Sequence, residues 1–141
     1  GPDAAAFLDR IYSNLMSTLP VGRARYGFML REDGIAYDDG TAWRLSETAF
    51  LVTATTGHAA GVLEHLERWR QTVWTDLRVA VQPVTDVWAG LAVAGPRARA
   101  ALARVAGGDV SDAALPFMGV AEMPVAGIPA RVARISFSGE L

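Results

Sequence analysis

An acidic pair is the first place in this 141-residue sequence where chemistry could occur. Asp38 and Asp39 follow the short apolar segment 35–37 and precede Gly40. A carboxylate at a strand end that faces a pocket can serve as an acid or a base, because burial tunes its proton affinity. Asp-Asp-Gly is also ordinary turn sequence, and a polar turn is its commoner use. The residues alone leave both interpretations open.

A second acidic candidate is Glu140, which follows Ser138 and Gly139 near the end of the sequence. A carboxylate at this position could accept two parallel hydrogen bonds from the N–H edge of a heterocycle. The plainer alternative is a solvated glutamate.

The remaining polar and aromatic residues give weaker signals. His58 and His65 lie seven residues apart, and no Cys or third His exists, so no metal site is expected. The aromatic residues are better explained by packing than by ligand stacking. No phosphate-binding glycine loop and no GxSxG nucleophile motif is present, so nucleotide binding and serine hydrolysis have no support.

Composition narrows the class of protein further. Hydrophobic residues make up 51% of the chain and the net charge is −2. This balance suits a domain with a sizeable core, and it disfavours nucleic acid, which needs a clustered basic surface. No apolar run approaches the length of about 20 residues that spans a bilayer. A cytoplasmic protein without a membrane partner is therefore expected.

The elements that must position these residues follow from periodicity and turn signals. A helix is predicted from Pro2, with Phe7, Leu8, Ile11 and Leu15 at helical spacing. Further helices are predicted after Thr55 and from Pro96. Strands are predicted at 24–31, 35–37, 41–45, 50–54, 77–81, 87–94, 119–125 and 130–137. Antiparallel strands interrupted by three helices predict an α+β fold, with mostly antiparallel sheet in ferredoxin-like halves.

An internal repeat bears on the extent of the domain. The pattern Gly-Pro-x-Ala-x-Ala-x-Leu-x-Arg occurs at residues 1–10 and again at 95–104. The second copy follows the predicted strand 87–94, so the repeat predicts another strand before residue 1.

Several stretches together resemble the aminomethyltransferase family, which includes the T-protein of the glycine cleavage system. They are residues 21–30, 31–41, 93–98, 127–131 and 135–141. The phrases Met-Leu-Arg-Glu-Asp-Gly at 29–34 and Ser-Phe-Ser-Gly-Glu-Leu at 136–141 are most similar to the branch formed by sarcosine oxidase alpha subunits. One departure fits that branch: Gly40 stands where the T-protein has an aliphatic residue.

The resemblance implies roles for four residues. Asp39 falls on the family's catalytic aspartate, and Glu140 on the glutamate that holds the pterin ring. Tyr26 falls on a tyrosine of the folate pocket. Asn14 matches an asparagine that is common after the first helix, and is assigned to folate binding with a less definite role.

The resemblance also implies a function. Residues 1–141 would be part of a folate-binding domain, truncated at both ends and inactive alone. The parent sarcosine oxidase would oxidise its amine elsewhere, with flavin and NAD. This domain would pass the iminium's one-carbon unit to tetrahydrofolate, giving 5,10-methylenetetrahydrofolate. The alternatives are a non-catalytic module that assembles with the other oxidase subunits, or the folate domain of another methylamine demethylase, such as dimethylglycine oxidase.

Overall fold

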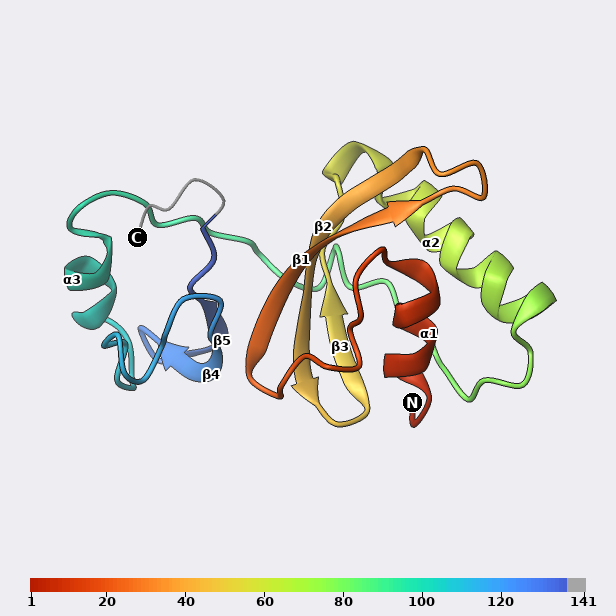
Figure 1. Ribbon diagram of the computed structural model, residues 1–141. Coiled ribbons are helices and arrows are strands. Elements are labelled where there is room, and N and C mark those ends of the chain that lie inside the picture. Colours follow the sequence, from red (N-terminus) through yellow and green to blue (C-terminus); the bar gives the residue numbers. More distant parts are fainter. Residues whose placement is uncertain (137–141) are drawn as a thin grey trace.

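The computed structural model describes residues 1–136, which form two unequal lobes joined by a long irregular segment (Figure 1). The larger lobe contains α1 (Ala4–Ile11), β1 (Arg23–Leu30), β2 (Ala36–Ser46), β3 (Ala49–Val52) and α2 (Ala59–Arg68). A 3₁₀ turn, Thr56–His58, precedes α2, and a π-helical turn, Trp69–Val73, follows it. The smaller lobe contains α3 (Ala98–Ala103), β4 (Val120–Val125) and β5 (Ile128–Ala133). The predicted α+β class with three helices is confirmed.

The larger lobe is built on an antiparallel sheet with the order β1-β2-β3. Gly34 allows the β1–β2 turn, because its φ of +80° suits glycine. Strand β2 is a single element of 11 residues that merges the predicted strands 35–37 and 41–45. Asp38, Asp39 and Gly40 therefore lie inside a strand, and the turn interpretation of this acidic pair is wrong.

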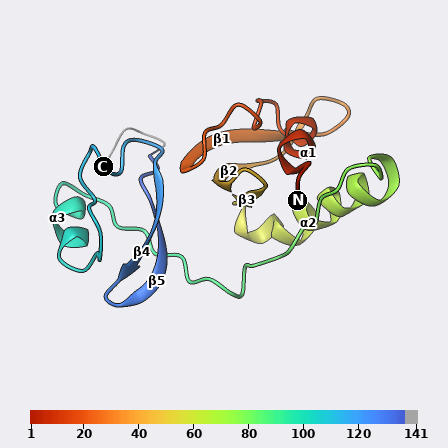
Figure 2. The same ribbon diagram turned by 90° about the horizontal axis from the view of Figure 1, so that it is seen from below.

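Two helices cover one face of this sheet, and the smaller lobe lies on the opposite side (Figures 1 and 2). Phe7, Leu8 and Ile11 recur on one side of α1, because a helix brings such positions onto one face. They pack against Met29 of β1 and Ala42 of β2, together with Val62 and Leu66 of α2. Leu15 does not continue the helical stripe. The helix ends at Ile11, and Leu15 is exposed.

The chain that leaves α1 covers the outer edge of β1. The Ser13 N–H donates to the Phe28 carbonyl, and the Asn14 side-chain amide donates to the Tyr26 carbonyl, both over 2.9 Å. Gly27 permits this approach. A Cβ there would lie 2.5 Å from Asn14 Oδ1 and 2.8 Å from the Tyr12 ring.

The predicted strands 77–81 and 87–94 are wrong. Both stretches are irregular, and no neighbouring strand within residues 1–136 pairs with them. Alternating apolar residues favour extended chain, but a strand also needs a partner for its N–H and C=O groups. Val87, Leu91 and Val93 remain exposed.

The smaller lobe confirms the predicted final hairpin with a tighter connection. Ala126 and Gly127 have φ of +51° and +80°, as in a two-residue hairpin turn of the primed type. The predicted helix 96–105 is shortened to α3. Two backbone hydrogen bonds attach the smaller lobe to the start of β1. The Ala24 N–H donates to Met118 O and the Val120 N–H donates to Gly22 O, each over 2.8 Å.

None of the helices found between residues 1 and 136 has both the length and the apolar character needed to cross a membrane.

The tight contact at Gly27 predicts that Gly27→Ala destabilises the fold by about 1–3 kcal/mol, because buried Tyr12 and half-buried Asn14 must shift to admit the methyl group. Gly57→Ala is the matched control, since nothing lies within 4 Å of a Cβ there. Urea unfolding followed by tryptophan fluorescence measures both. Equal midpoints for the two variants would contradict this account of Gly27.

Candidate functional site

Tyr26 and Asp39 meet on the sheet face opposite the helices. In the β1–β2 register, Tyr26 pairs with Thr41 and Phe28 with Asp39, so all four side chains share one face. The Tyr26 hydroxyl donates a hydrogen bond to Asp39 Oδ2. The structure thus brings together two of the four residues that the resemblance selected.

The contact with Asp39 alters the chemistry of the phenol. The hydrogen bond to the carboxylate raises the pKa of Tyr26 above its ordinary value, with burial and the charge of Asp39 acting in the same direction. The phenol therefore stays neutral and keeps donating through physiological pH. A neutral donor holds the carboxylate in one orientation without cancelling its charge.

Phe28 completes the exposed part of this site. Its ring packs edge-to-face on Tyr26, with centroids 5.3 Å apart and planes at 80°. Phe28 is 44% exposed and is absent from the buried core. An aromatic ring is therefore displayed directly across the strand pair from Asp39.

A chain of hydroxyl contacts supports the same face beyond Asp39. The Trp43 indole N–H donates to Thr41 Oγ1 over 2.7 Å, and Thr41 Oγ1 lies 3.0 Å from Thr53 Oγ1. Gly40 lets residue 53 approach this closely, because a Cβ at Gly40 would lie 2.1 Å from Thr53 O. Close packing against Thr53 therefore explains why glycine occupies position 40 in this chain.

Asp38 points to the other face of the sheet and has a different role. Its side chain is buried, and its Oδ2 accepts a 3.0 Å hydrogen bond from the Thr55 N–H ahead of α2. Its Oδ1 lies 3.9 Å from His58 Nδ1. Burial raises the pKa of the nearby Tyr12 phenol, and the charge of Asp38 adds to that effect. Asp38 therefore ties α2 to the sheet, whereas Asp39 faces outward.

Asn14 reaches the site only through the backbone of Tyr26. Its amide nitrogen holds the Tyr26 carbonyl, while its Oδ1 is buried without a hydrogen-bond partner among the described residues. Asn14 therefore lies at the β1 edge rather than on the face that carries Asp39. Glu140 lies outside the described residues, so its position relative to Asp39 stays a prediction.

The two histidines belong to an aromatic cluster on the helix side. Tyr37 stacks on His65 at 4.5 Å and lies 4.7 Å from His58, measured between ring centroids. His65 Nε2 accepts a hydrogen bond from the Trp69 indole, and burial is the main cause that lowers the His65 pKa. Within residues 1–136, no three His, Asp or Glu side chains are grouped as metal ligands.

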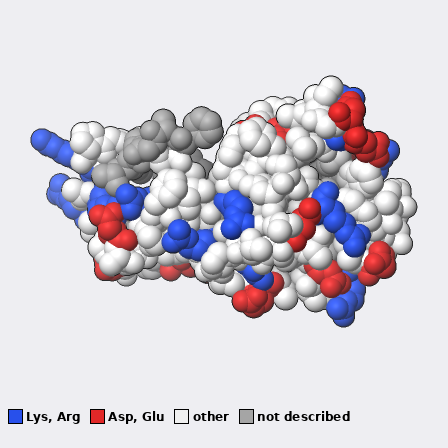
Figure 3. Space-filling model, in the orientation of Figure 1, with Lys and Arg blue, Asp and Glu red and all other residues white. Residues whose placement is uncertain are grey.

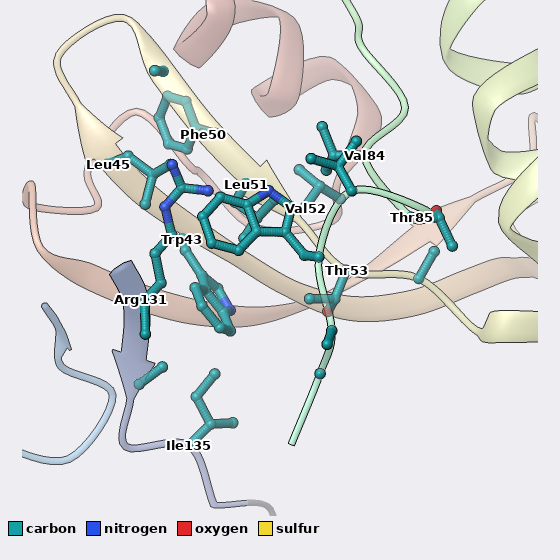
Figure 4. A pocket seen from close by; sticks show the side chains of 18 of the residues that line it. Trp43, Leu45, Phe50, Leu51, Val52, Thr53, Val84, Thr85, Arg131 and Ile135 are labelled. Atoms are coloured by element: carbon teal, nitrogen blue, oxygen red, sulfur yellow. The ribbon is translucent and has the colours of Figure 1, made fainter. Parts of the chain in front are cut away.

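A broad apolar groove runs beside β3 (Figure 4). Trp43 and Leu51 line it from the sheet, and Arg131 reaches into it from β5. The Arg131 guanidinium stacks 4.4 Å above the Trp88 ring, and its Nε lies 2.8 Å from a Glu122 oxygen. Neither Asp39 nor Tyr26 lines this groove; Tyr26 instead lines a shallower hollow with Phe117 and Met118. Because the groove lacks the Tyr26–Asp39 pair, we place the candidate chemistry at the pair itself.

The surface around the two lobes carries no large field of one sign on the face seen in Figure 3, where arginines and acids alternate.

Comparison with known proteins identifies the family. The whole chain, residues 1–141, matches the GCVT N-terminal domain, and the chain belongs to this family. It is 52% identical over 143 residues to the sarcosine oxidase subunit alpha of Rhizobium meliloti, and 38% identical over 144 residues to a probable aminomethyltransferase of Haloarcula marismortui. These alignments cover 100% and 99% of this chain, but only 14% and 38% of the two relatives.

A solved structure supports the same fold. The glycine cleavage system aminomethyltransferase T from Bartonella henselae matches 99% of this chain and 36% of its own, with a TM-score of 0.70 and 25% identity. The resemblance to the aminomethyltransferase family and the T-protein-like fold are confirmed.

Sequence reasoning did not select Phe28 as a functional residue. The signal was available, because strand alternation places Phe28 on the same face as Tyr26. Its position across from Asp39 became visible only once β2 was known to run through the acidic pair.

The raised pKa of Tyr26 gives a testable titration. Tyr26 should ionise above its ordinary value of about 10, and Asp39→Asn should move the transition back toward that value. Because the folded pKa is raised, the Tyr26–Asp39 contact stabilises the fold below pH ~10 and is lost as the pH rises through the folded pKa. Ultraviolet difference spectra, with Tyr26→Phe to assign the signal, measure the shift. An unchanged transition in Asp39→Asn would refute the coupling.

Proposed function

We propose that this chain forms part of the folate site of a sarcosine oxidase alpha subunit. The similarity to the Rhizobium meliloti subunit supports the choice of parent enzyme, and the Tyr26–Asp39 pair on the sheet face opposite the helices is the observation that carries the proposal. In the parent protein, a flavin held elsewhere oxidises sarcosine to an iminium, and NAD is likewise bound outside this chain. The other oxidase subunits are its partners, in the cytoplasm.

The proposed reaction transfers one carbon between two nitrogens. A tetrahydrofolate nitrogen attacks the iminium carbon, a C–N bond forms, and the C=N electron pair moves to the glycine nitrogen. The second folate nitrogen then displaces glycine, whose C–N bond breaks with its electron pair. The two folate N–H protons end on glycine, and 5,10-methylenetetrahydrofolate is left. No further oxidant or reductant is required.

Asp39 supplies what this chemistry needs. Its carboxylate stabilises the positive charge of the iminium and of the folate nitrogen that forms on attack, and it accepts the proton of that nitrogen. Tyr26 engages Oδ2. Oδ1 is the oxygen that we assign to the substrate. Because Tyr26 is neutral, the full negative charge of Asp39 remains available to a cation.

Three further residues complete the folate-binding assignment. Glu140 accepts two N–H bonds from the pterin edge, a geometry that suits a carboxylate. Tyr26 contributes the rim of the pocket. Asn14 contributes by holding the Tyr26 backbone in place through the 2.9 Å bond to its carbonyl.

A non-catalytic assembly role is the second candidate, and the exposed apolar segment favours it. Val87, Leu91 and Val93 are 72%, 90% and 54% exposed, which suits burial against another part of the oxidase. Calorimetric titration of the full oxidase with tetrahydrofolate separates the candidates, because an assembly module would show no folate-dependent heat. The folate domain of a dimethylglycine oxidase remains a third candidate, which amine specificity of the full enzyme would reveal.

Asp39→Asn in the full oxidase should lower the formation of methylenetetrahydrofolate by roughly a hundredfold or more, because acid–base assistance is lost. Sarcosine oxidation should persist and release formaldehyde instead. Asp38→Asn is the matched control and should cost much less, because Asp38 faces the helices and an amide oxygen can still accept from Thr55. Unchanged product yield in both variants would exclude Asp39 from the reaction.

Glu140→Gln should weaken folate binding by about 2–3 kcal/mol, because one pterin donor would then face another donor. Titration of the full oxidase with folate measures the loss, and the rate of sarcosine oxidation serves as the control for folding. Wild-type affinity in this variant would remove Glu140 from the site.

A further inference from the structure

The ring of Phe28 is the feature of the site that packing leaves unexplained. Gly27 and Met29, its neighbours in β1, face the helices, whereas Phe28 is 44% exposed on the opposite face. Its contact within the site is with Tyr26, and its cross-strand partner is Asp39. An apolar ring left in water beside a carboxylate adds little to the stability of the fold.

The pairing of ring and carboxylate has a definite chemical preference. The face of an aromatic ring carries negative electrostatic potential and attracts cations, and a nearby carboxylate attracts them as well. Tyr26 fixes both partners, because its hydroxyl bonds Asp39 and its ring packs against Phe28 at 80°. Phe28 and Asp39 are thus held by one side chain in a fixed mutual arrangement.

We propose that Phe28 and Asp39 together seat the cationic iminium, with the Phe28 ring against its flat CH₂=N⁺ group. This inference rests on the proposed function and assigns the site's cation specificity to a residue outside the acid–base chemistry. The ring also keeps water from one side of the iminium carbon. Water would otherwise add to that carbon and release formaldehyde and glycine, in competition with folate.

Phe28 would affect the reaction differently if its ring seated the iminium than if it stacked on the folate. A ring that stacks on the pterin would change folate affinity when removed. A ring that seats the iminium changes how the oxidised carbon is divided between folate and water, even when folate saturates its site. The ratio of formaldehyde to methylenetetrahydrofolate at saturating folate therefore tests the proposal.

The test uses the full oxidase with Phe28→Leu, which keeps an apolar side chain but removes the aromatic ring. The ratio of formaldehyde to methylenetetrahydrofolate should rise about threefold to tenfold, the range that a cation–π contact supports. Folate affinity and the rate of sarcosine oxidation should stay within about twofold of wild type. Phe28→Tyr should retain the wild-type ratio. Leu30→Ala is the matched control, because Leu30 lies on the same strand face, is 40% exposed and pairs with Ala36 rather than Asp39.

A second measurement uses the wild-type protein and does not depend on how a variant folds. Glycine betaine, a zwitterion whose trimethylammonium group is permanently positive, should raise the formaldehyde share. Its isostere 3,3-dimethylbutanoate keeps the carboxylate but has an uncharged carbon in place of the ammonium nitrogen, and it should not. An unchanged ratio in Phe28→Leu with folate bound, or equal effects of the two compounds, overturns the proposal. Loss of folate affinity in Phe28→Leu, with a normal ratio once folate saturates, overturns it in favour of stacking. Absence of folate binding in the wild-type oxidase instead overturns the proposed function.

Discussion

The antiparallel register between β1 and β2 is the constraint on which the rest of this structure depends. Side chains alternate across a strand, so adjacent residues face opposite ways. Asp38 therefore points into the helix-covered face and Asp39 away from it. A slip of one residue would exchange the two acids, burying the one that faces outward and removing the tie to Thr55. The pairing of Met29 with Asp38 and of Phe28 with Asp39 sets the environments of both carboxylates.

The same register gives the two faces of the sheet different roles. The helix face carries Met29 and Ala42, both with no exposed surface, and packs against Phe7 of α1. The other face carries Tyr26, Phe28 and Asp39, none of which belongs to that core. Stability and site chemistry therefore lie on opposite sides of one strand pair. Gly27 links them, because its missing side chain lets Tyr12 and Asn14 cover the β1 edge behind Tyr26.

Much of this arrangement could be predicted from residue patterns, and the failures share a physical cause. Helical spacing in α1 and the tight turn of the β4–β5 hairpin are local signals, and both predicted elements exist. The acidic pair was ambiguous because Asp-Asp-Gly suits a turn locally, while pairing with β1 makes it strand. The strands predicted at 77–81 and 87–94 are wrong for the opposite reason. The local sequence favours extended chain there, but no strand among the described residues pairs with either stretch. The resemblance selected Tyr26 and Asp39 separately, and their hydrogen bond became visible only in the structure.

The choice of tyrosine, rather than a cation, as the partner of Asp39 decides what the site can hold. An arginine at this place would orient the carboxylate equally well but would cancel its charge, leaving nothing to attract a cationic reactant. Tyr26 orients Asp39 Oδ2 and remains neutral, because the hydrogen bond raises the pKa of its phenol. No ion pair to Asp39 occurs within residues 1–136, whereas buried Asp38 has His58 Nδ1 at 3.9 Å. The outward acid thus keeps an uncompensated charge beside an exposed aromatic ring. That combination favours a small flat cation over an anion or a neutral molecule beside this pair.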